Sequence, residues 1–185
     1  MIRINKTDYF MGAFLNTIVK YSKERAINFK TSENTKIVEF TTQAGDFKIY
    51  IKYSTSLEEV EMKIGYEARL KTSCKFLFFD SEYNYLKDSF YSSEKINLLG
   101  LVFTNDRLTK THIALISLED AMDCLREKTR SGLRRISIYR LSGEPYFYCY
   151  GVGFKDYEHI RSPVDFTNLL GLDFYDRPYE QLRLL

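Results

Sequence analysis

The sequence is poor in the residues from which most recognisable active sites are built. Its 185 residues include two histidines, three cysteines, three prolines and no tryptophan. Cys74, Cys124 and Cys149 are too widely spaced for a zinc site and odd in number, which excludes a complete disulfide framework. We expect them to be reduced, buried thiols of a cytoplasmic protein.

Long apolar runs and glycine-rich loops are also missing. No stretch approaches the roughly 20 apolar residues of a transmembrane helix, and no apolar run follows the charged N-terminal residues as it does in a secretory signal. The nine glycines are scattered, so no phosphate-binding loop is recognisable. No serine, cysteine or aspartate can be placed beside His112 or His159 to form a triad. We therefore expect no membrane partner and no cofactor.

Size and composition indicate one globular domain spanning residues 1–185. A 44% hydrophobic content is enough for one substantial core, and no linker rich in Pro, Gly or Ser interrupts the chain. The net charge of +2 neither favours nor excludes a nucleic-acid partner. Residues 154–185 are predicted to be an acidic, partly helical C-terminal extension, with its helix starting at Ser162-Pro163.

Hydrophobic periodicity predicts an α+β (mixed α/β) domain. We expect a single central sheet, largely antiparallel or mixed, with an N-terminal helix and two or three further helices packed on it. The segment 96–103 is almost entirely apolar and should be an interior strand buried on both faces. The expected helices are 7–29, 80–90 and 118–128, and the expected strands are 36–42, 47–53, 59–65, 68–79, 96–103, 112–116, 134–140 and 146–151.

The most distinctive pattern lies in residues 47–53. Apolar residues at the odd positions alternate with Lys48, Tyr50 and Lys52, and the segment 59–65 shows a similar alternation of charged and apolar residues. We predict that the two segments pair as a hairpin. Its basic and aromatic face would then be a contact surface for a protein or a nucleic acid.

The charges of that hairpin have a purely structural interpretation as well. Glu59 and Glu61 on one strand would lie opposite Lys48 and Lys52 on the other. Such cross-strand ion pairs are worth a few tenths to about 1 kcal/mol each. On this interpretation, removing Glu61 changes little.

The same region also contains a candidate metal site. Asp46 is followed along the chain by Glu61 and, two residues later, by Lys63. This order resembles the PD-(D/E)XK nuclease superfamily, in which an acid and a D/E-x-K tripeptide on adjacent strands hold magnesium and activate water. The resemblance implies metal-dependent phosphodiester hydrolysis, with Asp46 and Glu61 as Mg²⁺ ligands and Lys63 positioning the nucleophile or stabilising charge. Glu24 stands where that family often has a further acid.

A second candidate contact surface is a basic cluster between residues 126 and 140. Tyr139, Tyr146 and Tyr148 are close to it in sequence, so the cluster suits phosphate contact combined with base stacking. Alternatively, the basic residues complement a helix C-terminus or are neutralised by the acidic extension. The cluster consists of Arg126, Lys128, Arg130, Arg134, Arg135 and Arg140.

These observations predict a small binding or interaction protein with no identifiable catalytic site. We expect an accessory or inhibitory partner of a nucleic-acid-processing system. A magnesium-dependent nuclease of restriction-endonuclease-like fold is the alternative. A third hypothesis is a homo-oligomer in which open strand edges pair across a two-fold axis.

Overall fold

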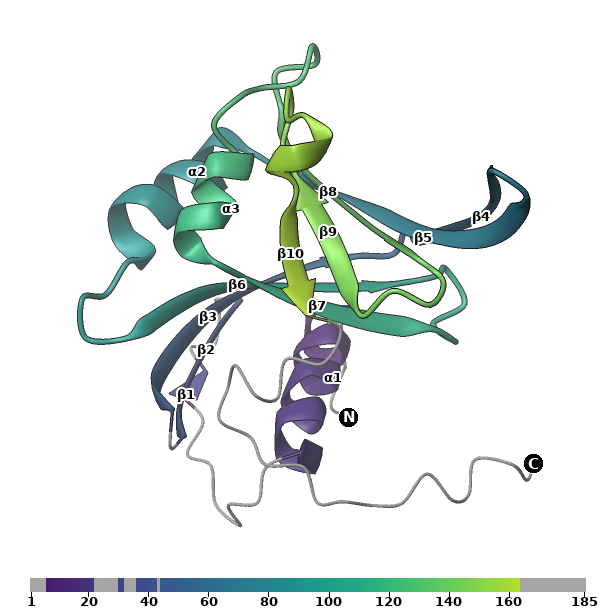
Figure 1. Cartoon of the computed structure of the whole chain (residues 1–185). Helices are drawn as coiled ribbons and strands as arrows, with labels where there is room; N and C mark the ends of the chain where they lie inside the picture. Colours follow the sequence, from purple (N-terminus) through teal and green to yellow (C-terminus); the bar gives the residue numbers. More distant parts are fainter. Residues whose placement is uncertain (1–5, 22–29, 32–35, 43, 164–185) are drawn as a thin grey trace.

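The computed structural model describes residues 6–21, 30–31, 36–42 and 44–163 (Figure 1). These residues form an α+β protein with two β-sheets, so the prediction of a single central sheet is wrong. The predicted strands do form. They divide between two sheets. One face of the first sheet is covered by helix α1 (Lys6–Tyr21), and its other face is covered by the second sheet.

The first sheet is mixed, in the order β1-β2-β3-β6-β7. Its centre is a parallel pair, β3 and β6, and its other pairs are antiparallel. The predicted interior strand is confirmed, since β6 lies between β3 and β7 and is buried along most of its length. The strands are β1 (Lys30–Thr31), β2 (Ile37–Thr42), β3 (Gly45–Ser54), β6 (Ile96–Thr104) and β7 (Thr111–Ser117).

The second sheet is antiparallel, in the order β10-β9-β8-β5-β4. The predicted hairpin of β8 and β9 is confirmed. Ser162-Pro163 belong to a strand that pairs with β9, so the predicted helix start there is wrong; residues 164–185 lie outside the described part of the chain. The strands are β4 (Glu58–Ile64), β5 (Glu67–Phe78), β8 (Arg134–Leu141), β9 (Tyr146–Tyr150) and β10 (Ile160–Pro163).

Three α-helices and two short helical turns complete the described structure. The helices are α1 (Lys6–Tyr21), α2 (Asp80–Tyr85) and α3 (Leu118–Cys124); the turns are η1 (Leu86–Phe90), π-helical, and η2 (Asp156–Glu158), a 3₁₀ turn. None of these helices has the length and apolar character needed to cross a membrane. Residues 22–29 of the predicted helix 7–29 fall outside the described residues.

Helix α3 begins as predicted but ends early. The hydroxyl of Ser117 accepts a hydrogen bond from the Asp120 amide at 3.0 Å, the expected N-cap. The helix stops at Cys124 rather than Lys128. Just beyond its end, the Arg134 guanidinium donates to the Leu125 carbonyl at 2.6 Å and satisfies one of the terminal acceptors.

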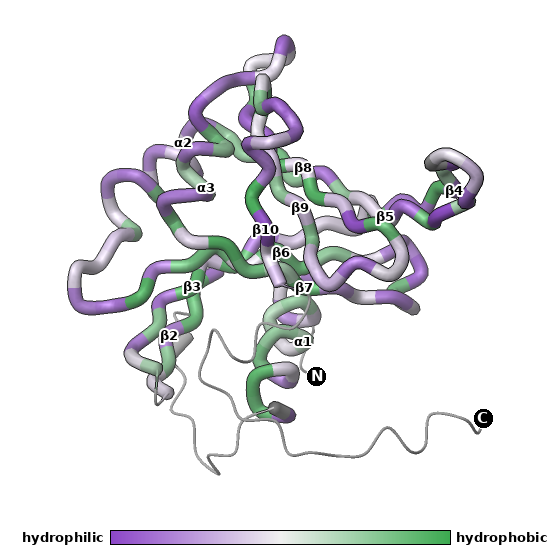
Figure 2. Tube along the Cα trace, viewed as in Figure 1, coloured by the Kyte–Doolittle hydropathy of each residue, from purple (hydrophilic) through white to green (hydrophobic). Residues whose placement is uncertain are grey.

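The protein has two apolar layers, one on each side of the first sheet. Phe10, Phe14 and Ile18 of α1 pack against one face of that sheet. Its other face packs against β5, β8 and β9 of the second sheet, and α2, η1 and α3 contribute to the same core. In Figure 2 the hydrophobic residues gather along one side of α1 and where the two sheets face each other.

The predicted hairpin between 47–53 and 59–65 does not exist. Strand β3 leaves the first sheet at Ser54, and after three residues the chain continues as β4 of the second sheet. The Leu57 amide donates to the Thr104 carbonyl at 3.2 Å and fixes this crossing. Strand β4 pairs only with β5, so Glu61 lies opposite Leu70 and faces neither Lys48 nor Lys52.

The two sheets meet again at β7 and β10. The fully buried Ser162 hydroxyl accepts from the Leu115 amide at 3.1 Å and donates to the Leu115 carbonyl at 2.8 Å. These contacts join edge strand β7 of the first sheet to edge strand β10 of the second sheet. On the opposite side, β3 runs beside the end of β5 without pairing with it, and this boundary is called the seam below.

Candidate functional site

The residues of the nuclease resemblance are not brought together. Asp46 lies at the start of β3, exposed, and bonds the Thr41 hydroxyl. Glu61 and Lys63 lie on β4, which projects with β5 from the other side of the molecule (Figure 1). Among the described residues, no group of three His, Cys, Asp or Glu side chains could hold a metal ion. The alternation pattern shows which residues of a strand share a face, but it carries no information on which sheet each strand joins. For this reason the sequence could not separate a hairpin from two strands of different sheets.

The basic face of β3 is covered rather than exposed. Tyr50 is only 6% exposed, and its hydroxyl donates to Glu82 of α2 at 3.1 Å. The Lys52 ammonium lies 2.7 Å from both Glu82 carboxylate oxygens, and Lys36 lies 3.3 Å from one of them. The Lys48 ammonium lies 5.1 Å from the Phe90 ring centre. Helix α2 therefore takes the place that we had predicted for a binding partner.

Burial and the carboxylate of Glu82 shift the pKa values of this cluster. Burial lowers the pKa of Lys52, and Glu82 opposes that shift. Burial also acts to raise the pKa of Glu82, but the ammonium groups of Lys52 and Lys36 and the Phe79 amide outweigh it and hold the pKa below its usual range. Burial, followed by the neighbouring Glu82 charge, raises the pKa of Tyr50. Lys52 and Glu82 thus form a partly buried ion pair, and Lys36 and Tyr50 are further partners of the same carboxylate.

The predicted basic cluster is divided among three places. Arg134 and Arg140 lie on the side of β8 that faces the core, where their guanidinium groups stack over the rings of Tyr83 and Phe147. Arg130 is exposed on the loop before β8. Of the four predicted contact arginines, only Arg135 lies on the outer face of the second sheet, opposite Leu77.

That outer face gathers aromatic and basic side chains from four strands. Residues of β5, β8 and β9 alternate between the core and this face, and paired residues share a face. One row across the sheet joins Ser73, Tyr139, Tyr148 and Arg161 through successive strand pairs. The neighbouring row joins Lys75, Ser137 and Tyr150. The three α-helices pack elsewhere, on the first sheet or in the core between the sheets, whereas His159, directly after η2, packs against Tyr139 and Tyr150.

The aromatic rings of the outer face are already stacked in pairs. Tyr139 and Tyr148 are stacked, with ring centres 5.2 Å apart, and Tyr150 stacks on His159 at 4.5 Å. The Tyr139 hydroxyl lies 3.3 Å from His159 Nδ1, which links the two pairs. Burial raises the pKa of Tyr139 above its ordinary value. The rings are therefore held in fixed positions before any ligand arrives.

Basic groups outnumber acids on the same face. The Lys71 ammonium lies 4.8 Å from the Tyr139 ring centre, and the Nε atom of Arg135 is buried with no hydrogen-bond partner among the described residues. The strand pairing assigns five basic and two acidic side chains to this face: Arg69, Lys71, Lys75, Arg135 and Arg161 against Glu58 and Glu67. The strands of this face therefore carry an excess of basic side chains, while the acids Asp156 and Glu144 act on Tyr139 from the loops beside it.

Part of this face could have been found from the sequence. The predicted turn at 142–145 pairs Tyr139 with a residue near Tyr148, and Arg69, Lys71 and Lys75 occupy alternate positions of one predicted strand. The sequence does not reveal that β5 pairs with β8. Without that pairing, the lysines and the tyrosines could not be placed on one surface.

Comparison with known proteins adds no relative. No protein-family model, no curated protein and no solved structure matches this chain.

Proposed function

We propose that the protein is a non-catalytic binding protein that holds single-stranded nucleic acid on the outer face of its second sheet. The supporting observation is the stacked pair Tyr139 and Tyr148, surrounded by basic side chains on a sheet face that none of the three described α-helices covers. Aromatic rings stack on bases of any sequence, and lysine and arginine contact the phosphates. This combination suits an accessory protein of a nucleic-acid-processing system.

The proposal requires an unpaired strand rather than a duplex. In a duplex the bases are stacked on one another, and their faces are closed to the tyrosine side chains of a sheet surface. In a single strand the bases can be splayed out while the phosphates remain within reach of the basic side chains at the edges of the face. We therefore expect a single strand to bind more tightly than a duplex of the same length.

Fluorescence anisotropy with a labelled oligothymidylate of about 15 nucleotides tests this function, because one OB-fold-sized site contacts about 4–16 nucleotides. Tyr148→Ala should weaken binding by about 1–3 kcal/mol, the usual contribution of one stacked base. Arg161→Ala should reduce the steepness of the salt dependence by about 0.7 in log–log slope, as expected for one phosphate contact with a single strand.

Two matched variants serve as controls. Tyr91 is an exposed tyrosine on the loop after η1, and Arg130 is an exposed arginine outside the outer face. Tyr91→Ala and Arg130→Ala should bind as the unmodified protein does. Binding that is absent, insensitive to salt or equally weakened by the control variants would refute the proposal.

A further inference from the structure

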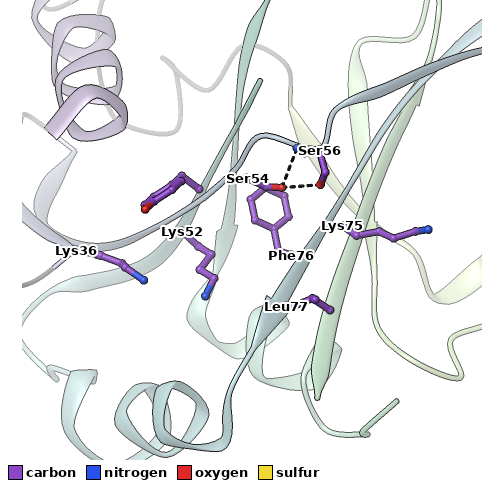
Figure 3. A pocket seen from close by; sticks show the side chains of 8 residues that line it. Lys36, Lys52, Ser54, Ser56, Lys75, Phe76 and Leu77 are labelled. Atoms are coloured by element: carbon purple, nitrogen blue, oxygen red, sulfur yellow. Dashed lines mark hydrogen bonds between the residues drawn. The ribbon is translucent and has the colours of Figure 1, made fainter. Parts of the chain in front are cut away.

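A separate cavity opens at the seam between β3 and β5. Its volume is about 360 Å³, within the range of small-molecule sites. Lys36, Lys52, Ser54 and Ser56 line one side and Lys75 to Leu77 the other (Figure 3). The lining contains three lysines and two serines, and the acid Glu82 pairs with Lys52 and Lys36, which leaves an excess of lysine. A cavity with this lining attracts an anion.

The edge of β5 adds backbone donors to this lining. Leu70 exchanges hydrogen bonds with Ser142 on the β8 side of the strand, so alternate residues from Leu70 onward point toward β8. Lys75 and Leu77 therefore direct their amides to the opposite side. Strand β4 would cover that side, but it begins at Glu58, opposite Ser73. Among the described residues, no strand pairs with these two amides.

The side-chain donors are partly free as well. The Lys75 ammonium is exposed and has no hydrogen-bond or ion-pair partner among the described residues; in Figure 3 it extends outward from the rim. Lys36 makes one 3.3 Å contact with Glu82 and keeps further N–H groups. The hydroxyls of Ser54 and Ser56 lie 2.7 Å apart, so one donates to the other; the Cys74 thiol, 3.7 Å from the Ser56 hydroxyl, can donate to it and leave the remaining hydroxyl hydrogen for a ligand.

We infer that the seam cavity binds a phosphate group carried by a small organic molecule. The donors come from both sides of the cavity, with lysine ammonium groups and hydroxyls on the β3 side and strand-edge amides on the β5 side. A tetrahedral phosphate presents oxygens in several directions, whereas a planar carboxylate presents two in one plane. A phosphomonoester also carries a charge of about −1.5 to −2 at pH 7, which suits the excess of lysine over acid. The volume beyond the phosphate accommodates its organic body, in contact with the partly exposed Tyr53.

This inference shares Lys75 with the face proposed for nucleic acid, but Ser56 belongs to the cavity alone, and a titration with inorganic phosphate tests it on the full chain. Calorimetry in chloride buffer should show one saturable site. Lys75→Gln and Ser56→Ala should each weaken phosphate binding by about tenfold, the equivalent of one lost hydrogen bond to a charged group. Both side chains are exposed or at the rim, so both variants should fold.

The matched control is Lys87→Gln, which removes an exposed lysine on η1 away from the seam and should leave phosphate binding unchanged. Absence of saturable binding, or equal weakening in the control, overturns the inference. Acetate binding as tightly as phosphate also overturns it, because the cavity would then be a carboxylate site. Phosphate binding without oligonucleotide binding would support the cavity and refute only the outer-face function.

Discussion

Replacing Glu82 by glutamine should destabilise the protein more than any other single change of a charged side chain considered above. The Glu82 carboxylate accepts hydrogen bonds from Lys52, Lys36, Tyr50 and the Phe79 amide. Only 16% of its side chain and 12% of that of Lys52 are exposed. Glutamine keeps the size of the side chain and removes the charge. The Lys52 ammonium is then left in the interior without a counter-charge.

The magnitude follows from this burial. Removing one partner of a fully buried ion pair lowers the free energy of unfolding by about 3–5 kcal/mol, whereas removing one partner of an exposed pair lowers it by at most about 1 kcal/mol. Because both side chains retain some solvent contact, we expect Glu82→Gln to lower the free energy of unfolding by about 2–3 kcal/mol. For a domain of this size, this corresponds to a fall in Tm of roughly 5–10 °C.

Urea denaturation of four proteins measures the effect: the unmodified chain, Glu82→Gln, Lys52→Met and the double variant. Removing both charges should recover most of the loss, because Met fills the space of the lysine stem without a charge. The control is Glu59→Gln, which breaks the more exposed pair with Lys110 and should cost less than about 1 kcal/mol. A loss for Glu82→Gln below about 0.5 kcal/mol, or no recovery in the double variant, would refute the reasoning.

The same pair gives a pH dependence of known sign. The pKa of Glu82 is lower in the folded protein than its ordinary value of 4.5, so its stabilising contribution is complete above that value. It is lost as the pH falls through the lowered pKa of the folded state. The stability difference between the unmodified protein and Glu82→Gln should therefore shrink on acidification below about pH 4.5. A difference that is constant or grows would contradict the assignment.

Three further substitutions test the packing. Ser162→Ala should cost about 2–4 kcal/mol in denaturant unfolding, since it leaves the amide and carbonyl of Leu115 without their buried partner; a loss under about 1 kcal/mol would argue against the link between the sheets. Gly151→Ala places a Cβ 2.1 Å from the Cys124 carbonyl oxygen and should prevent folding to a stable state, as circular dichroism would show. Gly12→Ala meets nothing within 4 Å in α1 and should raise the stability by about 0.5–1 kcal/mol, with a decrease as the contrary result.

Most elements could be predicted from the sequence because their patterns are local. The apolar run 96–103 gave an interior strand, and the turn residues at 142–145 gave a hairpin. The assignment of strands to sheets could not be predicted, because alternation shows only which residues share a face. The clearest pattern in the chain, in β3, was misinterpreted for this reason. Its lysines look like surface residues until α2 supplies a carboxylate 30 residues later in the sequence.

The candidate site was predicted only in part. The sequence places Tyr139, Tyr148 and Arg135 in one region, and in the structure these residues lie on one face; their role in binding stays a prediction. Arg134 and Arg140 could not be separated from them, because inward-facing arginines are stabilised by rings that come from distant segments. The seam cavity had no local signal, since its two sides belong to different sheets.

The parallel pairing of β3 and β6 has a consequence for how the chain folds. The segment between them supplies β4, β5, α2 and η1, and β4 and β5 belong to the other sheet. The central pair of the first sheet therefore cannot close as a local hairpin, and its formation has to bring together residues about 50 positions apart. Pairings of such long range slow folding, because the entropy of loop closure is lost before the contacts are gained. The interleaved order also means that neither sheet corresponds to a continuous fragment of the chain, so refolding is expected to be slow and to gain both sheets in one cooperative step.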